Sequence, residues 1–218
     1  MSAPAPQKII FTNDITPILV SLAAEMTPSS VFVVTDANVA AKVLPSLGLP
    51  SEWEVIAVPP GDTNKDLDSL ALIWRSLTSG GATRKSLVVN IGGGVVTDMG
   101  GFAAATFKRG VRFINVPTTL LSAVDAAVGG KTGINFEGYK NEIGVFANAD
   151  AVVISTVTFS TLPPVEILSG YAEMIKHSLL EDRESFGRLL AFDISEADAD
   201  RLLHLLEESV RVKERIVT

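Results

Sequence analysis

Cysteine is absent from the 218 residues, and so is any long apolar run. Without thiols the chain has no disulfides, thiolate metal sites or cysteine nucleophiles, which suits a reducing compartment. No apolar run approaches the ~20 residues that span a bilayer, and the first residues, MSAPAPQK, lack the apolar core of a signal peptide. We therefore expect a cytoplasmic protein with no membrane partner.

Basic residues are in the minority, because 18 Lys and Arg face 25 Asp and Glu and leave a net charge of -7. An acidic surface repels phosphate backbones, so we expect no nucleic-acid partner. A small anionic ligand is compatible with this balance, since a few lysines can dominate one cleft. The 47% of hydrophobic residues supply a core and exclude a disordered chain.

Short β-branched runs recur along the first part of the sequence and predict strands that are buried on both faces. They are SSVFVVTD at 29–36, WEVIAVP at 53–59, KSLVVNI at 85–91, VRFINVP at 111–117 and AVVIST at 151–156. Segments with helical character lie between them, at 65–77 and 98–108. Strands that alternate with helices indicate an α/β fold with a parallel sheet.

The pattern changes near Pro163 and Pro164, which suit the first turn of a helix. Apolar residues then keep helical spacing to about Leu180, and again from Leu202 to Val217. We expect residues 1–162 to form the α/β domain and residues 163–218 to begin an all-helical domain that is truncated at its end.

The strongest local motif is GGGVVTDMGG at 92–101, which follows a predicted strand and opens a helix. Consecutive glycines let a backbone approach a ligand closely, and a helix start offers N–H groups to a phosphate. The glycine spacing is not that of the standard dinucleotide fingerprint, and a simple tight turn is an alternative interpretation.

Two other segments carry candidate chemistry. Residues 116–146 place lysines among glycines, which favours a phosphate or carboxylate ligand, although a long surface loop with solvated charges is the plainer interpretation. After Pro164, Glu173 and His177 stand one helical turn apart and suit one divalent cation, with a solvated helix face as the alternative. His204 is expected at the surface.

The motifs GGGVVTDMGG, PTTLLSAVDAAVGGKTGIN, KNEIG and LSGYAEMIKH closely resemble the 3-dehydroquinate synthase family, and the resemblance runs from Val31 to the end. It implies an NAD- and metal-dependent enzyme, usually a homodimer, of the shikimate pathway. Such an enzyme converts 3-deoxy-arabino-heptulosonate 7-phosphate into 3-dehydroquinate and phosphate, and NAD is oxidised only transiently. The implied fold is a Rossmann-like NAD-binding domain followed by a helical metal and substrate domain, with the active site between them.

The resemblance also implies roles for individual residues. NAD would contact Asp36, Gly61, Asp62, Lys65, Gly93, Gly94, Val95, Val96, Thr97, Asp98, Thr118, Thr119, Asp125, Lys131, Lys140, Thr158, Phe159, Ser160 and Thr161. The substrate and its reacting groups would contact Asp125, Lys131, Lys140, Asn141 and Lys176, while Arg109 would reach the substrate phosphate from the second subunit. Glu173 would bind the metal, zinc or cobalt. The family's other metal ligands are histidines beyond residue 218, so we expect this chain alone to be inactive.

Two positions depart from the family pattern. Asp62 stands where the family usually has Glu, and Thr97 stands where it often has Gly, so we expect a Cβ to crowd the loop. Three other functions stay open: a related sugar phosphate cyclase that takes sedoheptulose 7-phosphate, a polyol dehydrogenase of the glycerol dehydrogenase type, and a non-catalytic NAD-binding module.

Overall fold

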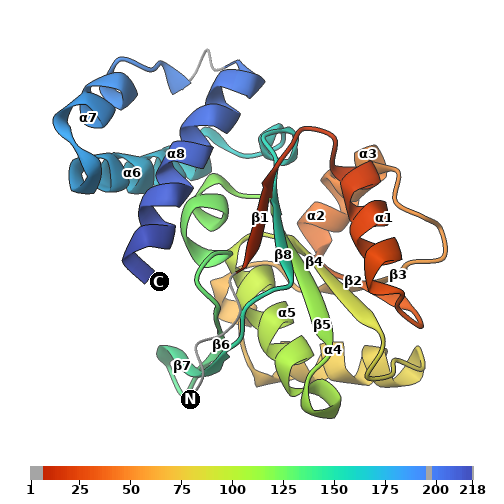
Figure 1. Ribbon diagram of the computed structural model, residues 1–218. Coiled ribbons are helices and arrows are strands. Elements are labelled where there is room, and N and C mark those ends of the chain that lie inside the picture. Colours follow the sequence, from red (N-terminus) through yellow and green to blue (C-terminus); the bar gives the residue numbers. More distant parts are fainter. Residues whose placement is uncertain (1–6, 195–197, 218) are drawn as a thin grey trace.

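A sheet of parallel strands forms the centre of the computed structural model, which describes residues 7–194 and 198–217 (Figure 1). The strands follow the order β1-β8-β5-β4-β2-β3, and every pairing in this sheet is parallel. Their bounds are β1 Lys8–Phe11, β2 Val31–Asp36, β3 Glu54–Val58, β4 Leu87–Gly92, β5 Arg112–Pro117 and β8 Ala151–Ile154. The predicted strands and the α/β class are confirmed, and β1 is an addition at the sheet edge.

Helices cover both faces of the sheet, which explains the near-continuous apolar strands. One face packs against α1 (Ile15–Met26), α2 (Ala37–Lys42) and α3 (Leu44–Leu47), and the other packs against α4 (Leu67–Ser79) and α5 (Gly94–Thr106). Within β2, Val33 belongs to the first of these apolar cores and Val34 to the second, and neither is exposed. The helix predicted at 98–108 corresponds to α5, which begins earlier than expected, at Gly94 in the glycine loop.

The loop interpretation of 116–146 is wrong for most of that segment. A π-helical turn, η3 (Ser122–Ala126), leads into an antiparallel hairpin of β6 (Lys131–Phe136) and β7 (Tyr139–Phe146). Glu137 and Gly138 join the two strands with left-handed backbone angles (φ +50° and +84°). Every residue of β7 is exposed, so neither face of this strand needs apolar side chains. Its sequence, YKNEIGVF, accordingly lacks the regular apolar alternation that predicts a strand.

Helices follow the sheet as expected, beginning with α6 (Pro164–Glu181) and ending with α8 (Ala199–Val217); α7 (Arg183–Leu190) was not predicted. Met174, Leu206 and Val210 join the apolar core beside α5, so these helices pack on the α/β part. Several apolar side chains of the helices stay exposed, among them Leu168 and Leu179.

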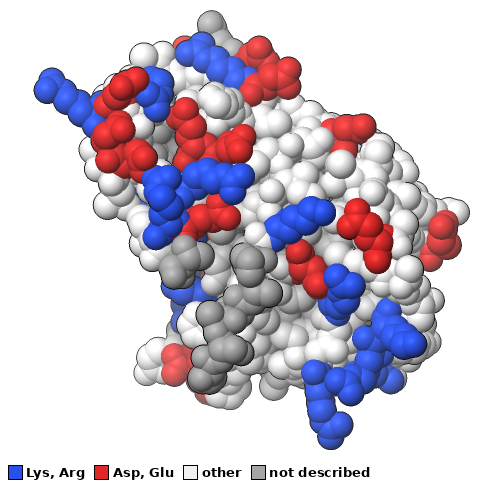
Figure 2. All heavy atoms as spheres, viewed as in Figure 1, with Lys and Arg blue, Asp and Glu red and all other residues white. Residues whose placement is uncertain are grey.

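Short 3-10 turns connect the larger elements: η1 at Asp62–Asn64, η2 at Phe107–Arg109 and η4 at Val157–Phe159. On the face seen in Figure 2, acidic and basic side chains are interspersed over α6–α8. None of the helices in the described ranges has the length and apolarity needed to cross a membrane.

Candidate functional site

A cavity of about 670 Å³ opens at the carboxyl ends of β2, β4 and β5. The chain moves outward from β2 to β3 and then returns to the other side of β2 with β4, so the connections reverse direction between β2 and β4. Crevices at such a reversal are where parallel α/β sheets bind ligands. The predicted residues that line this cavity are Asp36, Gly61, Asp62, Lys65, Gly93, Gly94, Val95, Asp98, Thr118, Thr119, Asp125, Lys140 and Thr161.

The glycine loop forms one wall of this cavity. A Cβ on Gly93 would lie 3.0 Å from Cγ2 of Thr119, and a Cβ on Gly94 would lie 3.3 Å from Cβ of Ala126. The loop thus packs tightly against its neighbours and presents bare backbone at the start of α5, which has no side-chain cap. A helix start of this kind suits the phosphates of a dinucleotide.

Thr97 is buried beside the glycine loop. Its hydroxyl group lies 3.4 Å from the carbonyl oxygen of Gly93 and 3.2 Å from that of Gly94. Val96 is buried as well, and neither residue lines the cavity. The crowding of the loop by the Thr97 Cβ stays a prediction.

Asp36 also lines the cavity and is the last residue of β2. Its Oδ1 accepts hydrogen bonds from the backbone nitrogens of Asn38 (2.8 Å) and Val39 (3.1 Å) and so caps α2. A carboxylate in this position is placed to accept a hydrogen bond from a ribose hydroxyl of a dinucleotide.

A second, polar cavity of about 470 Å³ adjoins the first and lies between the hairpin, α5 and α8. Its charged and amide lining is Asp98, Asp125, Lys131, Asn141, Glu142 and Lys213, of which Asp98 and Asp125 line both cavities. Within residues 7–194 and 198–217, Lys131 has no carboxylate at ion-pair distance. Its ammonium is therefore available to an anionic ligand.

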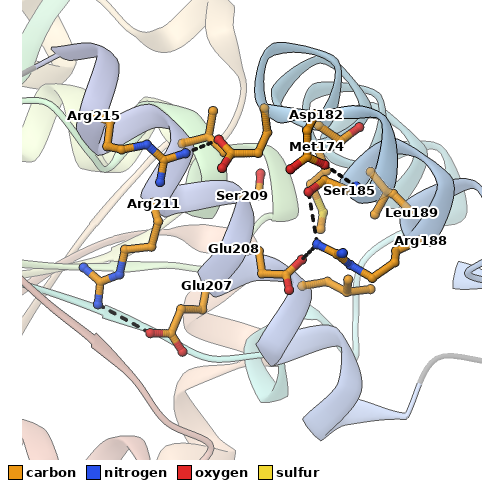
Figure 3. A pocket seen from close by; sticks show the side chains of 14 residues that line it. Met174, Asp182, Ser185, Arg188, Leu189, Glu207, Glu208, Ser209, Arg211 and Arg215 are labelled. Carbon is orange, nitrogen blue, oxygen red and sulfur yellow. Dashed lines mark hydrogen bonds and ion pairs between the residues drawn. The ribbon is translucent and has the colours of Figure 1, made fainter.

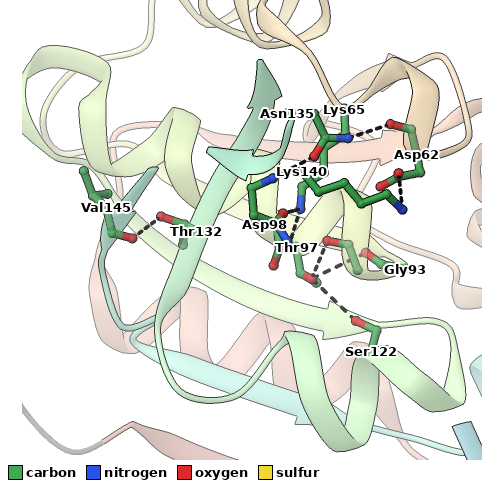
Figure 4. A network of polar contacts seen from close by, with 12 residues as sticks. Asp62, Lys65, Gly93, Thr97, Asp98, Ser122, Thr132, Asn135, Lys140 and Val145 are labelled. Atoms are coloured by element: carbon green, nitrogen blue, oxygen red, sulfur yellow. Dashed lines mark hydrogen bonds and ion pairs between the residues drawn. The ribbon is translucent and has the colours of Figure 1, made fainter. Parts of the chain in front are cut away.

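Two lysines hold the carboxylates at the junction between the cavities. Lys65 is 4% exposed and binds Oδ2 of Asp98 at 2.6 Å, and Lys213 binds Oδ1 of Asp125 (Figure 4 shows the first pair). Burial raises the pKa of Asp98, and the Lys65 ammonium opposes that rise. The negative charge of Asp98 is thus sustained by Lys65 in a largely desolvated place.

Asp62 and Lys140 form a more exposed pair at the rim, 2.9 Å apart. The hydrogen bond from Lys140 is the largest cause that lowers the pKa of Asp62. Asp62 stands where the family usually has Glu, and its shorter side chain still reaches Lys140 of the hairpin.

Glu173 lies on α6 beside Lys176 and His177. Its Oε1 accepts a bond from Lys176 and lies 3.3 Å from Nε2 of His177, whose Nδ1 is 2.8 Å from Oγ of Ser209. Burial lowers the pKa of His177. The contact with Ser209 joins this end of α6 to α8, the helix that carries Lys213.

A complete metal site is not present in the described ranges, because no three His, Asp or Glu side chains there lie close enough together to hold an ion. Glu173 and His177 offer two donors, and His177 is engaged with Ser209. His204 is exposed, as expected.

Some predicted residues lie outside the two cavities. Arg109 lies in η2, beyond the far end of α5, with a left-handed backbone angle (φ +66°). Thr158 and Phe159 are buried, and the Thr158 hydroxyl donates to the carbonyl of Pro117, which fixes η4 to the end of β5. Ser160 is exposed.

Lys213 is the main site residue that sequence reasoning missed. It lies on the inward face of α8, one turn after the buried Val210, and its side chain is only 14% exposed. A lysine within the apolar stripe of a helix is a readable signal, because such a charge is buried only when it is paired. Glu142, in the KNEIG motif on β7, lines the polar cavity as well, although the resemblance gave it no role.

A third cavity, of about 340 Å³, lies between α6, α7 and α8 (Figure 3). Its charged side chains pair with one another: Arg188 with Glu208 at 3.4 Å, Arg211 with Glu207 at 3.4 Å, and Arg215 with Glu181. Because these arginines and glutamates already pair with one another, they offer no free charge to a ligand. We therefore interpret this cavity as a groove between packed helices.

The sequence profile of the family described as 3-dehydroquinate synthase N-terminal matches residues 55–169, which is more than half of the chain. The chain belongs to the 3-dehydroquinate synthase family. A 3-dehydroquinate synthase of Parabacteroides distasonis is 46% identical over 97% of this chain and 61% of its own length. Another, of Pyrococcus abyssi, is 42% identical over 91% of this chain and 60% of its own length. The chain thus spans about 60% of the length of these 3-dehydroquinate synthases.

Solved structures confirm the fold expected of the 3-dehydroquinate synthase family. A 2-epi-5-epi-valiolone synthase from Streptomyces hygroscopicus, with NAD+ and Zn2+ bound, has a TM-score of 0.83 at 24% identity and covers 99% of this chain and 62% of its own. A 2-deoxy-scyllo-inosose synthase complexed with carbaglucose-6-phosphate, NAD+ and Co2+ has a TM-score of 0.81 at 21% identity, over 96% of this chain and 60% of its own.

Proposed function

We propose that the complete gene product is a 3-dehydroquinate synthase, which converts 3-deoxy-arabino-heptulosonate 7-phosphate into 3-dehydroquinate and phosphate. Family membership supports the reaction. The observation that carries the proposal is the junction of two cavities at Asp98 and Asp125, one fitted to a dinucleotide and the other lined by lysines. A hydride acceptor and an anionic substrate would meet at this junction.

NAD fits the larger cavity, because its lining combines the bare backbone of tightly packed glycines with the carboxylate of Asp36. Bound there, NAD would supply a hydride acceptor that takes and later returns one hydride. The start of α5 would bind the pyrophosphate, and Asp36 would bind the ribose of the adenosine half. Thr118 and Thr119 line the wall beside them.

The substrate would occupy the polar cavity. Lys131, Asn141 and Lys213 would hold its phosphate and carboxylate, and Asp125 would hold its hydroxyls. Loss of phosphate breaks a C–O bond after the neighbouring carbon gives up a proton, which the departing phosphate itself would take. The lysines would stabilise the charge that develops on the enolate and on the departing phosphate.

Arg109 would complete the phosphate site of a second copy in a homodimer. α5 runs from Gly94 to Thr106 and separates Arg109 from the glycine loop of its own chain. Thirteen helical residues extend over roughly 20 Å. Arg109 lines neither of the two cavities of its own chain, which supports a role across a dimer interface.

The residues in the described ranges do not fit a closed metal site. We propose Glu173, near Lys176, as one ligand of a zinc or cobalt site in the complete gene product, and we propose that this chain alone is inactive. We also propose the domain division at 162 and 163, one residue before α6 begins at Pro164. A cytoplasmic location belongs to the same proposal.

Phosphate release by the complete gene product tests the function. With NAD+ and zinc or cobalt, we expect release from 3-deoxy-arabino-heptulosonate 7-phosphate and no net NADH. Turnover of sedoheptulose 7-phosphate instead would identify a related cyclase, and net NADH from a polyol would identify a dehydrogenase. Turnover by the 218-residue chain alone would contradict its proposed inactivity.

A further inference from the structure

The hairpin β6–β7 is fastened to the short segment that precedes α4. The backbone nitrogen of Asn135 donates to the carbonyl of Lys65 at 2.8 Å, and its side-chain nitrogen donates to the carbonyl of Asp62 at 3.0 Å. The Asn135 side-chain oxygen in turn accepts from the backbone nitrogen of Asn141 at 2.9 Å. Asn141 has a left-handed backbone (φ +53°), so these bonds hold it in an uncommon conformation.

Lys65 adds a buried contact to this attachment. Its ammonium binds Asp98 on α5 and also binds Oδ1 of Asn141 on β7. An ammonium has three donors, so it can serve both partners at once. Figure 4 shows the Lys65 side chain pointing from its own segment toward Asp98. One lysine therefore joins α5 to the hairpin.

These three residues also bridge the two cavities. Lys65 lines the nucleotide cavity, Asn141 lines the polar cavity, and Asp98 lines both. Because the Lys65 side chain is only 5% exposed, water screens its bonds weakly, and the loss of one partner is felt by the other. A ligand that orders the start of α5 would therefore also order the hairpin.

We propose that Lys65 is a positioning residue that couples occupancy of the nucleotide cavity to the order of hairpin β6–β7, and thereby prepares the polar cavity for the substrate. This inference rests on the proposed binding of NAD. It assigns Lys65 a structural bridge in addition to the contact with the cofactor that the sequence implied.

Hydrogen exchange of the 218-residue chain, followed by mass spectrometry, tests the coupling. Amides of residues 131–146 are measured with and without NAD+ in wild type, Lys65→Met, Lys65→Arg and Asn141→Asp. Lys42→Met is the control, because Lys42 lines the same cavity beside Asp36, away from the hairpin. A parallel calorimetric titration measures NAD+ affinity for each variant, and circular dichroism shows whether each variant folds.

In wild type we expect NAD+ to slow exchange of the hairpin. In Lys65→Met without ligand we expect exchange about tenfold faster, the size that follows from losing a hydrogen bond to a charged group. Binding of NAD+ should no longer slow hydrogen exchange of the hairpin in this variant. Lys65→Arg and Asn141→Asp keep a charged contact and should retain the response, as should Lys42→Met.

A Lys65→Met chain that folds, binds NAD+ and still slows hairpin exchange on binding would overturn the coupling while leaving the proposed cofactor intact. If Lys65→Met does not fold, Asn141→Leu replaces it, because this variant removes the bond between Lys65 and the hairpin. A response retained in Asn141→Leu would overturn the coupling, and a lost one would support it. Failure of wild type to bind NAD+ would overturn both proposals.

Discussion

Gly100, in the middle of α5, is a position where one added methyl group should damage the site. A Cβ there would lie 2.1 Å from Oδ1 and 2.6 Å from Cγ of Asn90, a buried residue of β4. Asn90 donates to Asn115 at 2.9 Å within the sheet, so it cannot turn aside without losing that bond. The clash would push α5, and with it the glycine loop at its start, away from the sheet.

We expect Gly100→Ala to lower the free energy of unfolding by about 2 kcal/mol. Overpacking costs about 1–3 kcal/mol and the lost hydrogen bond about 1 kcal/mol, while the better helix propensity of alanine returns about 1 kcal/mol. For a chain of this size the loss corresponds to a fall in Tm of about 4–8 °C. Urea unfolding followed by circular dichroism measures it.

Two variants make the reasoning refutable. Gly187→Ala in α7, where nothing lies within 4 Å of an added Cβ, should stabilise the chain by up to about 1 kcal/mol. Asn90→Ala combined with Gly100→Ala should recover the part of the loss that comes from overpacking, but not the part that comes from the bond to Asn115. Gly100→Ala as stable as wild type, or no recovery in the double variant, would refute the tight packing of α5.

Other expected outcomes concern the charged residues. Asp36→Ala should weaken NAD+ binding about tenfold and also remove the α2 cap, worth about 1 kcal/mol, whereas Asp36→Asn should keep the cap; equal losses of stability in urea would contradict this. Lys131→Met should weaken binding of inorganic phosphate to the chain about tenfold by calorimetry, and an unchanged Kd would contradict an open cationic site. Because burial lowers the pKa of His177, the unfolded chain takes up the proton first, so stability should fall as pH falls below 6.5. His177→Gln should flatten that fall, and parallel unfolding curves would contradict the desolvated ring.

The parallel sheet was readable from the sequence because each of its central strands is an apolar run covered on both faces, as Val33 and Val34 show. The hairpin was not readable, because β7 is exposed along its length and its conformation depends on contacts with residues 62–65. Long-range polar contacts of this kind leave no periodic trace in a sequence.

In the candidate site, too, local motifs were readable from the sequence and long-range contacts were not. Residues within contiguous motifs, such as Gly93 and Asp98, were assigned from the resemblance and line the expected cavity. The pairing of Lys65 with Asp98 and of Lys213 with Asp125 depends on elements that are far apart in the chain. Only the fold brings them to the junction of the two cavities.

The most direct test of the central claim is a calorimetric titration of NAD+ into the 218-residue chain, with and without zinc. We expect binding that does not change when zinc is added, because the nucleotide cavity is formed within the chain whereas the described residues lack a metal site. Absence of binding would contradict the assignment of the cavity at the carboxyl edge of the sheet to NAD. Binding that tightens with zinc would show that Glu173 takes part in a metal site within this chain.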